Sequence, residues 1–518
     1  MIRIDVYRQY FTVTSVVFSK LLFTLYDFNK QLTTYKLTTV KTKGSRFVKP
    51  RLTTEEDKYF YIIETETEGN PNSKNQIRYV IECLKPLLEY LNSNGIADKD
   101  IKIVHHSFPT YKEYSIKTNP KYIPRPYQKE YIDKIVSWDG NNLLIDLQTG
   151  MGKTFIAMAS VSRMKKRFSI VVLPRYIDKW IEDITTLTNI KEHEILVLKG
   201  TKSIINMLLM PKKDILKYKA VILSLKSITI FIKDYLTGEI YTDKELNPER
   251  IFDKLATEIV ISDEVHQEFH NVYKLMLFSN IRLFIGLTAT LYSKDKRLEK
   301  MYHLLFPDKN RISNIVPYNR YITVFSVRYR FNNKKNIRFK TTFGYSHAIF
   351  ESSILKHSLI KFNYFNMLRL FLEKTYIKRR EDGDKALVFM GTIDMCKAFI
   401  DYLKGINTFK KLKINKYTEE DDYEVISDSD IIVSTLGSSG TGIDIKGLIV
   451  VLQTILIDSI QSNLQSLGRL RKIEGKEVMF IYFYSSDIPQ HVIYNRNRLR
   501  LFAPRVKSLN TVDYVDLI

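Results

Sequence analysis

The segment 149–154 reads TGMGKT and has the composition of a phosphate-binding loop. Gly150 and Gly152 allow the backbone to turn sharply, so that successive N–H groups can point at phosphate oxygens. Lys153 can reach the β- and γ-phosphates of a nucleotide, and the hydroxyl of Thr154 is a ligand suited to Mg²⁺. An apolar strand pattern, LLIDL, precedes the loop, and a helical pattern, FIAMASV, follows it. This context predicts a nucleotide site.

A second polar segment, DEVH, begins at Asp263 and directly follows the strand pattern EIVIS. Ligands of parallel α/β sheets bind at the carboxyl ends of the strands. There Asp263 can hold Mg²⁺ through water, and Glu264 can polarise the water that attacks a phosphate. A solvated acidic turn is the alternative interpretation. It is disfavoured because Thr288 and Thr290 end the next strand pattern after His266.

A third set of motifs lies far downstream. The segment 440–444, GTGID, follows the strand pattern DIIVST, and the segment 465–471, QSLGRLR, opens a helical pattern. An arginine that faces the phosphate site of another domain stabilises charge on the γ-phosphate, and Arg469 is the candidate for this role. A single arginine in a basic protein is more often a surface charge, but the order of the motifs favours function.

The hydropathy pattern divides the chain into four predicted parts. Residues 116–310 and 311–490 each alternate short apolar runs with helical stretches, which is typical of parallel sheets covered on both faces. Near 311–345 we expect an irregular basic connection. Residues 1–115 are predicted to form a small α/β module, and residues 491–518 a basic tail.

Within the N-terminal module, strand patterns occur in MIRIDVY, YKLTTVKT and YFYIIETET. Apolar residues recur at helical spacing from Gln76 to Asn92, which predicts a helix there. His105 and His106 are adjacent on a predicted strand and would point to opposite faces, so we do not expect them to share a metal.

The composition describes a globular and strongly basic chain. Its 518 residues include 80 Lys+Arg and 57 Asp+Glu, for a formal net charge of +23. This charge favours a polyanionic partner such as nucleic acid, although an AT-rich genome also enriches Lys, Ile, Asn and Tyr. The two cysteines cannot build a disulfide framework or a zinc site alone. No window is long and apolar enough to span a membrane, and the N-terminus lacks a signal-peptide pattern, so a cytoplasmic location is expected.

In their order and spacing, these motifs resemble those of superfamily 2 helicases, and the resemblance covers about residues 120 to 485. It implies an α/β fold with two tandem RecA-like parallel-sheet domains and a small N-terminal α/β domain. It also implies an ATP-hydrolysing enzyme that uses ATP and Mg²⁺. Further motifs that carry the resemblance are Val172–Pro174 with Trp180 after it, and Ala386–Met390.

The resemblance assigns roles to single residues. Catalytic roles are assigned to Lys153, Asp263, Glu264, Arg469 and Arg471. Nucleotide binding is assigned to Gln128, Thr149, Gly150, Gly152, Lys153, Thr154 and Asp444, with Gln128 reading adenine. Coupling of the nucleotide to strand binding is assigned to His266, Thr288 and Thr290, and the metal to Thr154 and Asp263. Lys472 stands where the family has its second arginine, so Arg471 and Lys472 are both candidates for that role.

Within the superfamily, the DExH box and the compact form resemble phage and viral DNA helicases of the UvsW type. This narrower resemblance implies a monomeric motor that remodels forked DNA or Holliday junctions in recombination, repair or replication, in the cytoplasm of a host cell. The N-terminal module would then engage the junction. The alternatives are an RNA helicase or transcript-release factor, a restriction-type motor subunit, and a binding protein with an inactive motor. Protein partners cannot be named from the sequence.

Overall fold

The computed structural model of the chain forms two compact units, Met1–Val316 and Pro317–Ile518, and we describe each by itself. The description covers all residues except 41–50, 64–74, 149, 240–243, 290, 294, 314, 316–318, 342–343, 419–420, 422–423, 437–444 and 517. Three of the predicted site residues, Thr149, Thr290 and Asp444, therefore lie outside the described residues. Within the described part, no helix has the length and apolar character needed to cross a bilayer.

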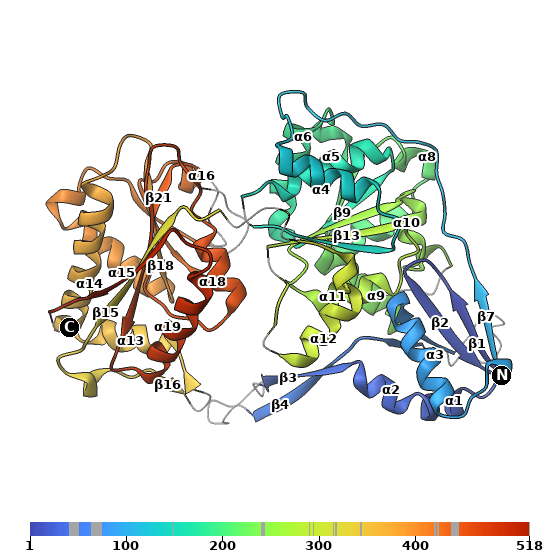
Figure 1. Cartoon of the computed structure of the whole chain (residues 1–518). Coiled ribbons are helices and arrows are strands. Elements are labelled where there is room, and N and C mark those ends of the chain that lie inside the picture. Colours follow the sequence, from blue (N-terminus) through green and yellow to red (C-terminus); the bar gives the residue numbers. More distant parts are fainter. Residues whose placement is uncertain are drawn as a thin grey trace. The chain divides into compact units, whose positions relative to one another are not determined.

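A parallel sheet of seven strands, ordered β10-β11-β9-β12-β13-β8-β14, forms the centre of the first unit (Figure 1). Its strands are β8 (Asn142–Asp146), β9 (Phe168–Val172), β10 (Ile195–Leu198), β11 (Ala220–Ser224), β12 (Ile259–Asp263), β13 (Leu283–Thr288) and β14 (Arg311–Ile312). Five of these strands, β8, β9, β11, β12 and β13, coincide with short apolar runs of the sequence. Each run is uninterrupted because both faces of the sheet are buried.

Helices cover both faces of this sheet (Figure 1). One face carries α4 (Pro126–Val136), α5 (Lys153–Met164) and α6 (Ile177–Leu187). The other side of the unit holds α7 (Thr201–Leu209), α8 (Lys212–Ile215), α9 (Leu225–Leu236), α10 (Arg250–Lys254), α11 (Phe269–Met276) and α12 (Lys296–Leu305). Along β8, Leu143 and Ile145 belong to the apolar core under α4, α5 and α6, whereas Leu144 belongs to the core on the opposite face. Successive side chains of one strand thus anchor helices on opposite faces.

The N-terminal module contains a mixed sheet ordered β5-β6-β2-β1-β7, in which only β1 and β7 are parallel neighbours. Its elements are β1 (Ile2–Val6), β2 (Tyr10–Ser15), α1 (Phe18–Thr24), α2 (Tyr26–Gln31), β5 (Tyr61–Ile63), β6 (Gln76–Val80), α3 (Leu84–Ser93) and β7 (Ile101–His105). A separate antiparallel pair joins β3 (Thr33–Val40) to β4 (Arg51–Lys58).

The helix predicted over 76–92 is wrong in its first part. Residues Gln76–Val80 form strand β6, which pairs with β2 and β5, and the α-helix begins only at Leu84. The apolar spacing is compatible with a helix, but pairing between two neighbouring strands overrides this local preference.

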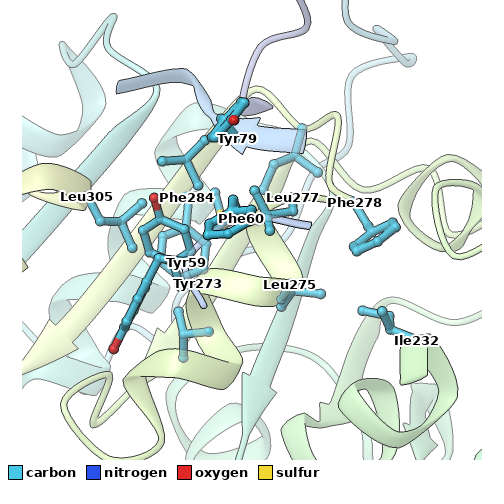
Figure 2. Close-up of a cluster of buried hydrophobic side chains, with 14 of the residues drawn as sticks. Tyr59, Phe60, Tyr79, Ile232, Tyr273, Leu275, Leu277, Phe278, Phe284 and Leu305 are labelled. Carbon is cyan, nitrogen blue, oxygen red and sulfur yellow. The ribbon is translucent and has the colours of Figure 1, made fainter. Parts of the chain in front are cut away.

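The module shares its apolar core with the seven-stranded parallel sheet of the same unit. Figure 2 shows Tyr59, Phe60 and Tyr79 of the module gathered against Tyr273 of α11 and Phe284 of β13, all of them buried. The rings of Tyr59 and Tyr273 meet edge to face with their centroids 4.9 Å apart. The module is therefore built into the first unit, because its buried side chains belong to the same apolar core as those of the large sheet.

The second unit contains another parallel sheet of seven strands, ordered β19-β20-β18-β21-β22-β15-β23. Its strands are β15 (Ile322–Tyr329), β18 (Lys385–Met390), β19 (Ile414–Tyr417), β20 (Ile431–Thr435), β21 (Leu448–Gln453), β22 (Val478–Ser485) and β23 (Ser508–Asp513), with a short pair β16 (Lys340–Thr341) and β17 (Gly344–Tyr345). Its helices are α13 (His347–Lys356), α14 (Ser358–Leu372), α15 (Ile393–Lys404), α16 (Glu424–Ser427), α18 (Ile460–Leu467) and α19 (Pro489–Phe502).

Two segments of this unit differ from their prediction. The expected connection near 311–345 contains β15, which lies inside the sheet between β22 and β23. The expected basic tail, 491–518, instead contains most of α19 and the whole of β23, which pairs with β15 in parallel. Basic composition obscured both elements, because Arg328 alternates with buried residues on β15 and Arg498 is buried on α19.

Candidate active site

The predicted phosphate-binding loop lies between β8 and α5 of the first unit. Gly150 and Gly152 both have left-handed backbones, with φ of +83° and +85°. Helix α5 begins directly after them at Lys153, so its free N–H groups lie beside the loop. A Cβ placed on Gly152 would come within 2.5 Å of Nε2 of Gln128. Glycine is required at this position both for its backbone conformation and for the close approach of α4.

Helix α4 holds the loop through two side chains at its N-terminus. Nε2 of Gln128 donates to the carbonyl of Met151 at 3.2 Å, and the hydroxyl of Tyr127 donates to the same carbonyl at 3.0 Å. Oε1 of Gln128 accepts from the backbone N–H of Arg125 at 2.9 Å. These bonds make Gln128 a positioning residue for the loop. Its reading of adenine stays a prediction.

Lys153 lies against the acidic segment that follows β12. Its Nζ is 3.9 Å from Oε1 of Glu264 and donates to the carbonyl of Leu147 at 3.3 Å. Only 10% of its side chain is exposed. An ammonium group held by a carboxylate and a carbonyl is available to an incoming phosphate, which offers it stronger charged acceptors.

Asp263 ends strand β12 and is deeply placed. Its Oδ1 accepts from the N–H of Glu264 at 2.9 Å, and its Oδ2 accepts from Nε1 of Trp180 at 3.2 Å. Burial raises the pKa of the Asp263 carboxyl, and repulsion from Glu264 adds to this. The nearby Lys153 and the Trp180 bond act in the opposite direction. A carboxyl pair in this setting gains from a cation that neutralises it.

The residues at the loop fit a bound Mg²⁺. Oε2 of Glu264 is buried and makes no hydrogen bond within the described part of the chain. The carboxylates at this site suit Mg²⁺, which keeps several waters and binds one or two carboxylates together with the phosphates of its nucleotide. Asp263 and the hydroxyl of Thr154 are the donors that this chain offers.

The two coupling residues that are described lie in contact. Nδ1 of His266 is 2.9 Å from Oγ1 of Thr288, at the end of β13. Burial, helped by the charge of Lys153, lowers the pKa of His266 to about 4. The imidazole is therefore neutral near pH 7 and links the ends of β12 and β13 by a hydrogen bond.

In the second unit, Arg469 and Arg471 follow helix α18. Arg469 is 6% exposed, whereas Arg471 is half-buried and its Nη1 donates to the carbonyl of Gly468. Lys472 is exposed. The described residues bring Lys153, Asp263 and Glu264 together in the first unit, and they place the two arginines on one turn of the second.

Sequence reasoning missed a polar link beside this site. Oε1 of Gln267 accepts from Nη2 of Arg175 at 2.6 Å and from the hydroxyl of Tyr176 at 3.2 Å. Gln267 is separated from Glu264 by only two residues, and Arg175 directly follows Pro174 after strand β9. Proximity to two recognised motifs was the available signal, but their pairing depends on β9 and β12 being neighbours in the sheet.

Comparisons with known proteins agree with this description. Residues 121–293 match the family model described as the res subunit of type III restriction enzymes. The chain is 25% identical over 189 residues to the DNA 3'-5' helicase XPB of Kineococcus radiotolerans, a match that covers 36% of this chain and 29% of that protein. The chain thus aligns with under a third of this relative's length.

Solved structures resemble the chain, and the structure of Mss116p supports the fold. The structure of Mss116p bound to ssRNA and AMP-PNP is similar with a TM-score of 0.51 and 16% identity, covering 76% of this chain and 75% of that chain. The helicase Lhr of Mycobacterium smegmatis bound to ssDNA and AMP-PNP has a TM-score of 0.48 and 16% identity, covering 75% of this chain and 49% of that chain. The expectation of two tandem RecA-like domains with a small N-terminal domain is confirmed.

By the family-model match and the curated relative, the chain is similar to superfamily 2 helicases. The narrower resemblance to UvsW-type helicases stays a prediction.

Proposed function

We propose that the chain is an ATP-dependent DNA helicase or translocase that unwinds or remodels forked DNA or Holliday junctions. The observation that carries the enzymatic part is the convergence of Lys153, Asp263 and Glu264 at the ends of β8 and β12, beside a loop that fits a triphosphate. A binding protein with an inactive motor is disfavoured, since none of these groups is replaced.

The proposed reaction is attack of water on the γ-phosphate. Bound ATP with Mg²⁺ would supply the phosphoanhydride bond and neutralise its oxygens. Thr154 and Asp263 would hold the ion, and Lys153 would leave Glu264 for the phosphate. Glu264, freed from Lys153, would accept the proton of the water as its oxygen bonds to phosphorus and the bond to the ADP oxygen breaks. Arg469 is proposed to stabilise charge on the γ-phosphate.

One observation favours DNA as the polymer, because net charge does not separate DNA from RNA. The net charge of +23 favours a phosphate backbone as partner. The curated relative is named a DNA 3'-5' helicase, which favours DNA over RNA. An RNA helicase with the same motor stays an alternative, because motor motifs contact the backbone and the 2′-OH must be read elsewhere.

A second candidate function is the motor subunit of a restriction-type complex. The specific observation in its favour is the description of the family that matches residues 121–293. Such a subunit would depend on a partner for full activity, whereas the preferred function predicts activity of the chain alone.

The test is the ATPase rate of the purified chain with matched amounts of single-stranded DNA, linear duplex, forked DNA, four-way junction and RNA, at two salt concentrations. Strongest stimulation by the branched DNAs is expected. Strongest stimulation by RNA would keep the motor and reject the DNA assignment. Stimulation only after addition of a partner subunit would support the restriction-type candidate.

A further inference from the structure

The side chain of Gln267 connects the turn that carries Glu264 to the end of strand β9. Its Oε1 accepts hydrogen bonds from Arg175 at 2.6 Å and from Tyr176 at 3.2 Å. Both donors belong to the short 3-10 helix Pro174–Tyr176 that follows β9. Since both neighbours are donors, the amide can face them only with its oxygen.

The turn that carries Glu264 is strained at both ends. Glu264 and Glu268 have left-handed backbones, with φ of +48° and +56°, although neither is glycine. The N–H of Gln267 donates to the carbonyl of Glu264 at 2.8 Å and closes the turn between them. Such backbones cost about 1–3 kcal/mol each and persist only where their surroundings hold them. The bonds of Gln267 to Arg175 and Tyr176 are restraints of this kind.

In the hydrogen bond between Arg175 and Gln267, only Arg175 is accessible to an anion from solvent. Arg175 is exposed, and its guanidinium lies 5.2 Å from the ring centre of Tyr176. Gln267 is half-buried, and its Nε2 is buried without a hydrogen-bond partner in the described part of the chain. A phosphate forms charge-assisted, bidentate bonds with arginine that are stronger than a bond to a neutral amide. A backbone phosphate can therefore displace Gln267 from Arg175.

In the resting geometry, Oε1 of Glu264 faces Lys153 at 3.9 Å, so the carboxylate is paired with the cation that the proposed reaction requires at the phosphate. We propose that Arg175 senses nucleic acid: without it, Arg175 holds Gln267 and keeps the turn 264–268 in this resting geometry. A backbone phosphate draws Arg175 away, the turn relaxes, and Glu264 leaves Lys153. This inference rests on the proposed function, because it requires that Glu264 acts on ATP. Arg175 and Gln267 are positioning residues in it.

The test uses the full chain with oligothymidylate as the probe and oligouridylate in parallel. Arg175→Gln and Gln267→Ala each remove the restraint, so each should raise the basal ATPase rate about fivefold, the lower end of a typical coupling between sites. The fully stimulated rate should stay near that of the unchanged chain, and the ratio of stimulated to basal rate should fall by the same factor. In the double variant, the ratio of stimulated to basal rate should be no lower than in either single variant, because both substitutions break the same hydrogen bond.

Three further measurements separate a sensor from a simple loss of binding. Arg175→Gln should weaken oligothymidylate binding and reduce its salt dependence by about one phosphate contact, whereas Gln267→Ala should leave binding unchanged. Gln267→Glu gives Arg175 a charged partner and should raise the oligothymidylate concentration needed for half-stimulation. Arg163→Gln, which removes the exposed Arg163–Asp133 pair on the same unit, is the matched control and should change none of these values.

The outcomes are distinguishable. Stimulation of the unchanged chain together with unchanged basal rates in both single variants would overturn the sensor and leave the proposed function standing. Multiplicative effects in the double variant would also overturn it. Absence of any nucleic-acid-stimulated hydrolysis in the unchanged chain would reject the proposed function and the inference together. Thermal melting of each variant, and recovery of the low basal rate in Arg175→Lys, exclude loss of folding as the cause.

Discussion

Single side chains of this protein have roles that depend on a few hydrogen bonds at strand ends. Lys153 begins helix α5, and Asp263 and Glu264 lie at the end of strand β12; Lys153 and Asp263 are each held by a partner outside the segments 149–154 and 263–266. Leu147 supplies a carbonyl to Lys153, and Trp180 supplies an N–H to Asp263. Substitutions of the motif residues and of their partners should therefore have different effects.

Lys153→Ala should abolish ATP turnover, with a loss on the order of 10²–10³-fold or more, because the γ-phosphate loses its main protein cation. Nucleic-acid binding at low salt should remain, since many other basic residues supply phosphate contacts. Parallel ATPase and filter-binding measurements check this. Lys129→Ala, which removes an exposed lysine from α4, is the control and should behave as the unchanged chain. Retained hydrolysis in Lys153→Ala would refute the phosphate assignment.

Trp180→Phe should raise the Mg²⁺ concentration needed for half-maximal ATPase activity roughly tenfold, as expected for partners of metal-binding side chains. The indole N–H holds Oδ2 of Asp263 and lowers its pKa, so its removal favours the protonated carboxyl, which binds metal poorly. Trp138→Phe is the matched control, because Trp138 is the other tryptophan of the chain and its indole N–H makes no hydrogen bond within the described residues. An unchanged Mg²⁺ dependence in Trp180→Phe would show that the bond does not tune the metal site.

Individual helices and strands owe their position to long-range packing more than to local preference. Helix α19 illustrates this, because it packs a polar side against the sheet of the second unit. His491 and Arg498 are fully buried on it, and Asn495 accepts hydrogen bonds from Tyr482 and Ser326. The basic composition of this segment suggested a tail, and only the partners on the sheet explain its burial. Groups held neutral inside an element make its stability depend on pH.

His491→Asn should reduce the dependence of unfolding free energy on pH. Burial lowers the pKa of His491 to about 3, so between pH 6.5 and about 3 the unfolded chain binds one proton that the folded chain does not. The stabilisation is fully present above pH 6.5 and is lost on acidification, by about 1.4 kcal/mol per pH unit. Glu351, whose pKa burial raises to about 7, acts in the opposite sense between about pH 7 and 4.5, and it is unchanged in the variant.

The measurement is urea unfolding between pH 7 and 4.5. Both tryptophans, Trp138 and Trp180, lie in the first unit, so tryptophan fluorescence reports unfolding of that unit. A change in circular dichroism without a change in fluorescence therefore reports unfolding of the second unit. His491→Asn should lower stability at pH 7 and flatten the slope by about one proton. His357→Asn, which replaces a half-buried histidine of the same unit, is the matched control. An equal slope in His491→Asn would contradict the proposed burial of a neutral imidazole.

At the scale of the whole molecule, the N-terminal module belongs to the first compact unit and shares its apolar core. Arg78 of β6 is 4% exposed, with its guanidinium 5.1 Å from the ring centre of Tyr10 and 4.7 Å from that of Phe278. It pairs with Glu249 and donates to the carbonyl of Leu277 at 3.1 Å. Deleting residues 1–115 would expose this apolar surface of the motor sheet. Junction recognition by the module is better tested by surface substitutions than by truncation.

Arg78→Met should destabilise the first unit by about 3 kcal/mol or more, because it removes one partner of a buried ion pair. We expect tryptophan fluorescence and calorimetry to report one cooperative transition for the module and the motor sheet, at a lower temperature than in the unchanged chain. Arg3→Met, which removes the more exposed Arg3–Asp5 pair on β1, should have a small effect. A separate early transition for residues 1–115 would contradict the shared core.

The sequence by itself determined the motor. Glycine, lysine and acidic residues at fixed positions beside apolar runs are local features, and parallel strands buried on both faces must be apolar throughout, so the motifs and most motor strands were predictable. Only the tertiary structure determined which side chains form hydrogen bonds to the motif residues and to the turn that follows them. The Trp180–Asp263 and Arg175–Gln267 contacts join segments far apart in sequence. Likewise, β6, β15 and β23 became strands because neighbouring strands paired with them, which no local periodicity records.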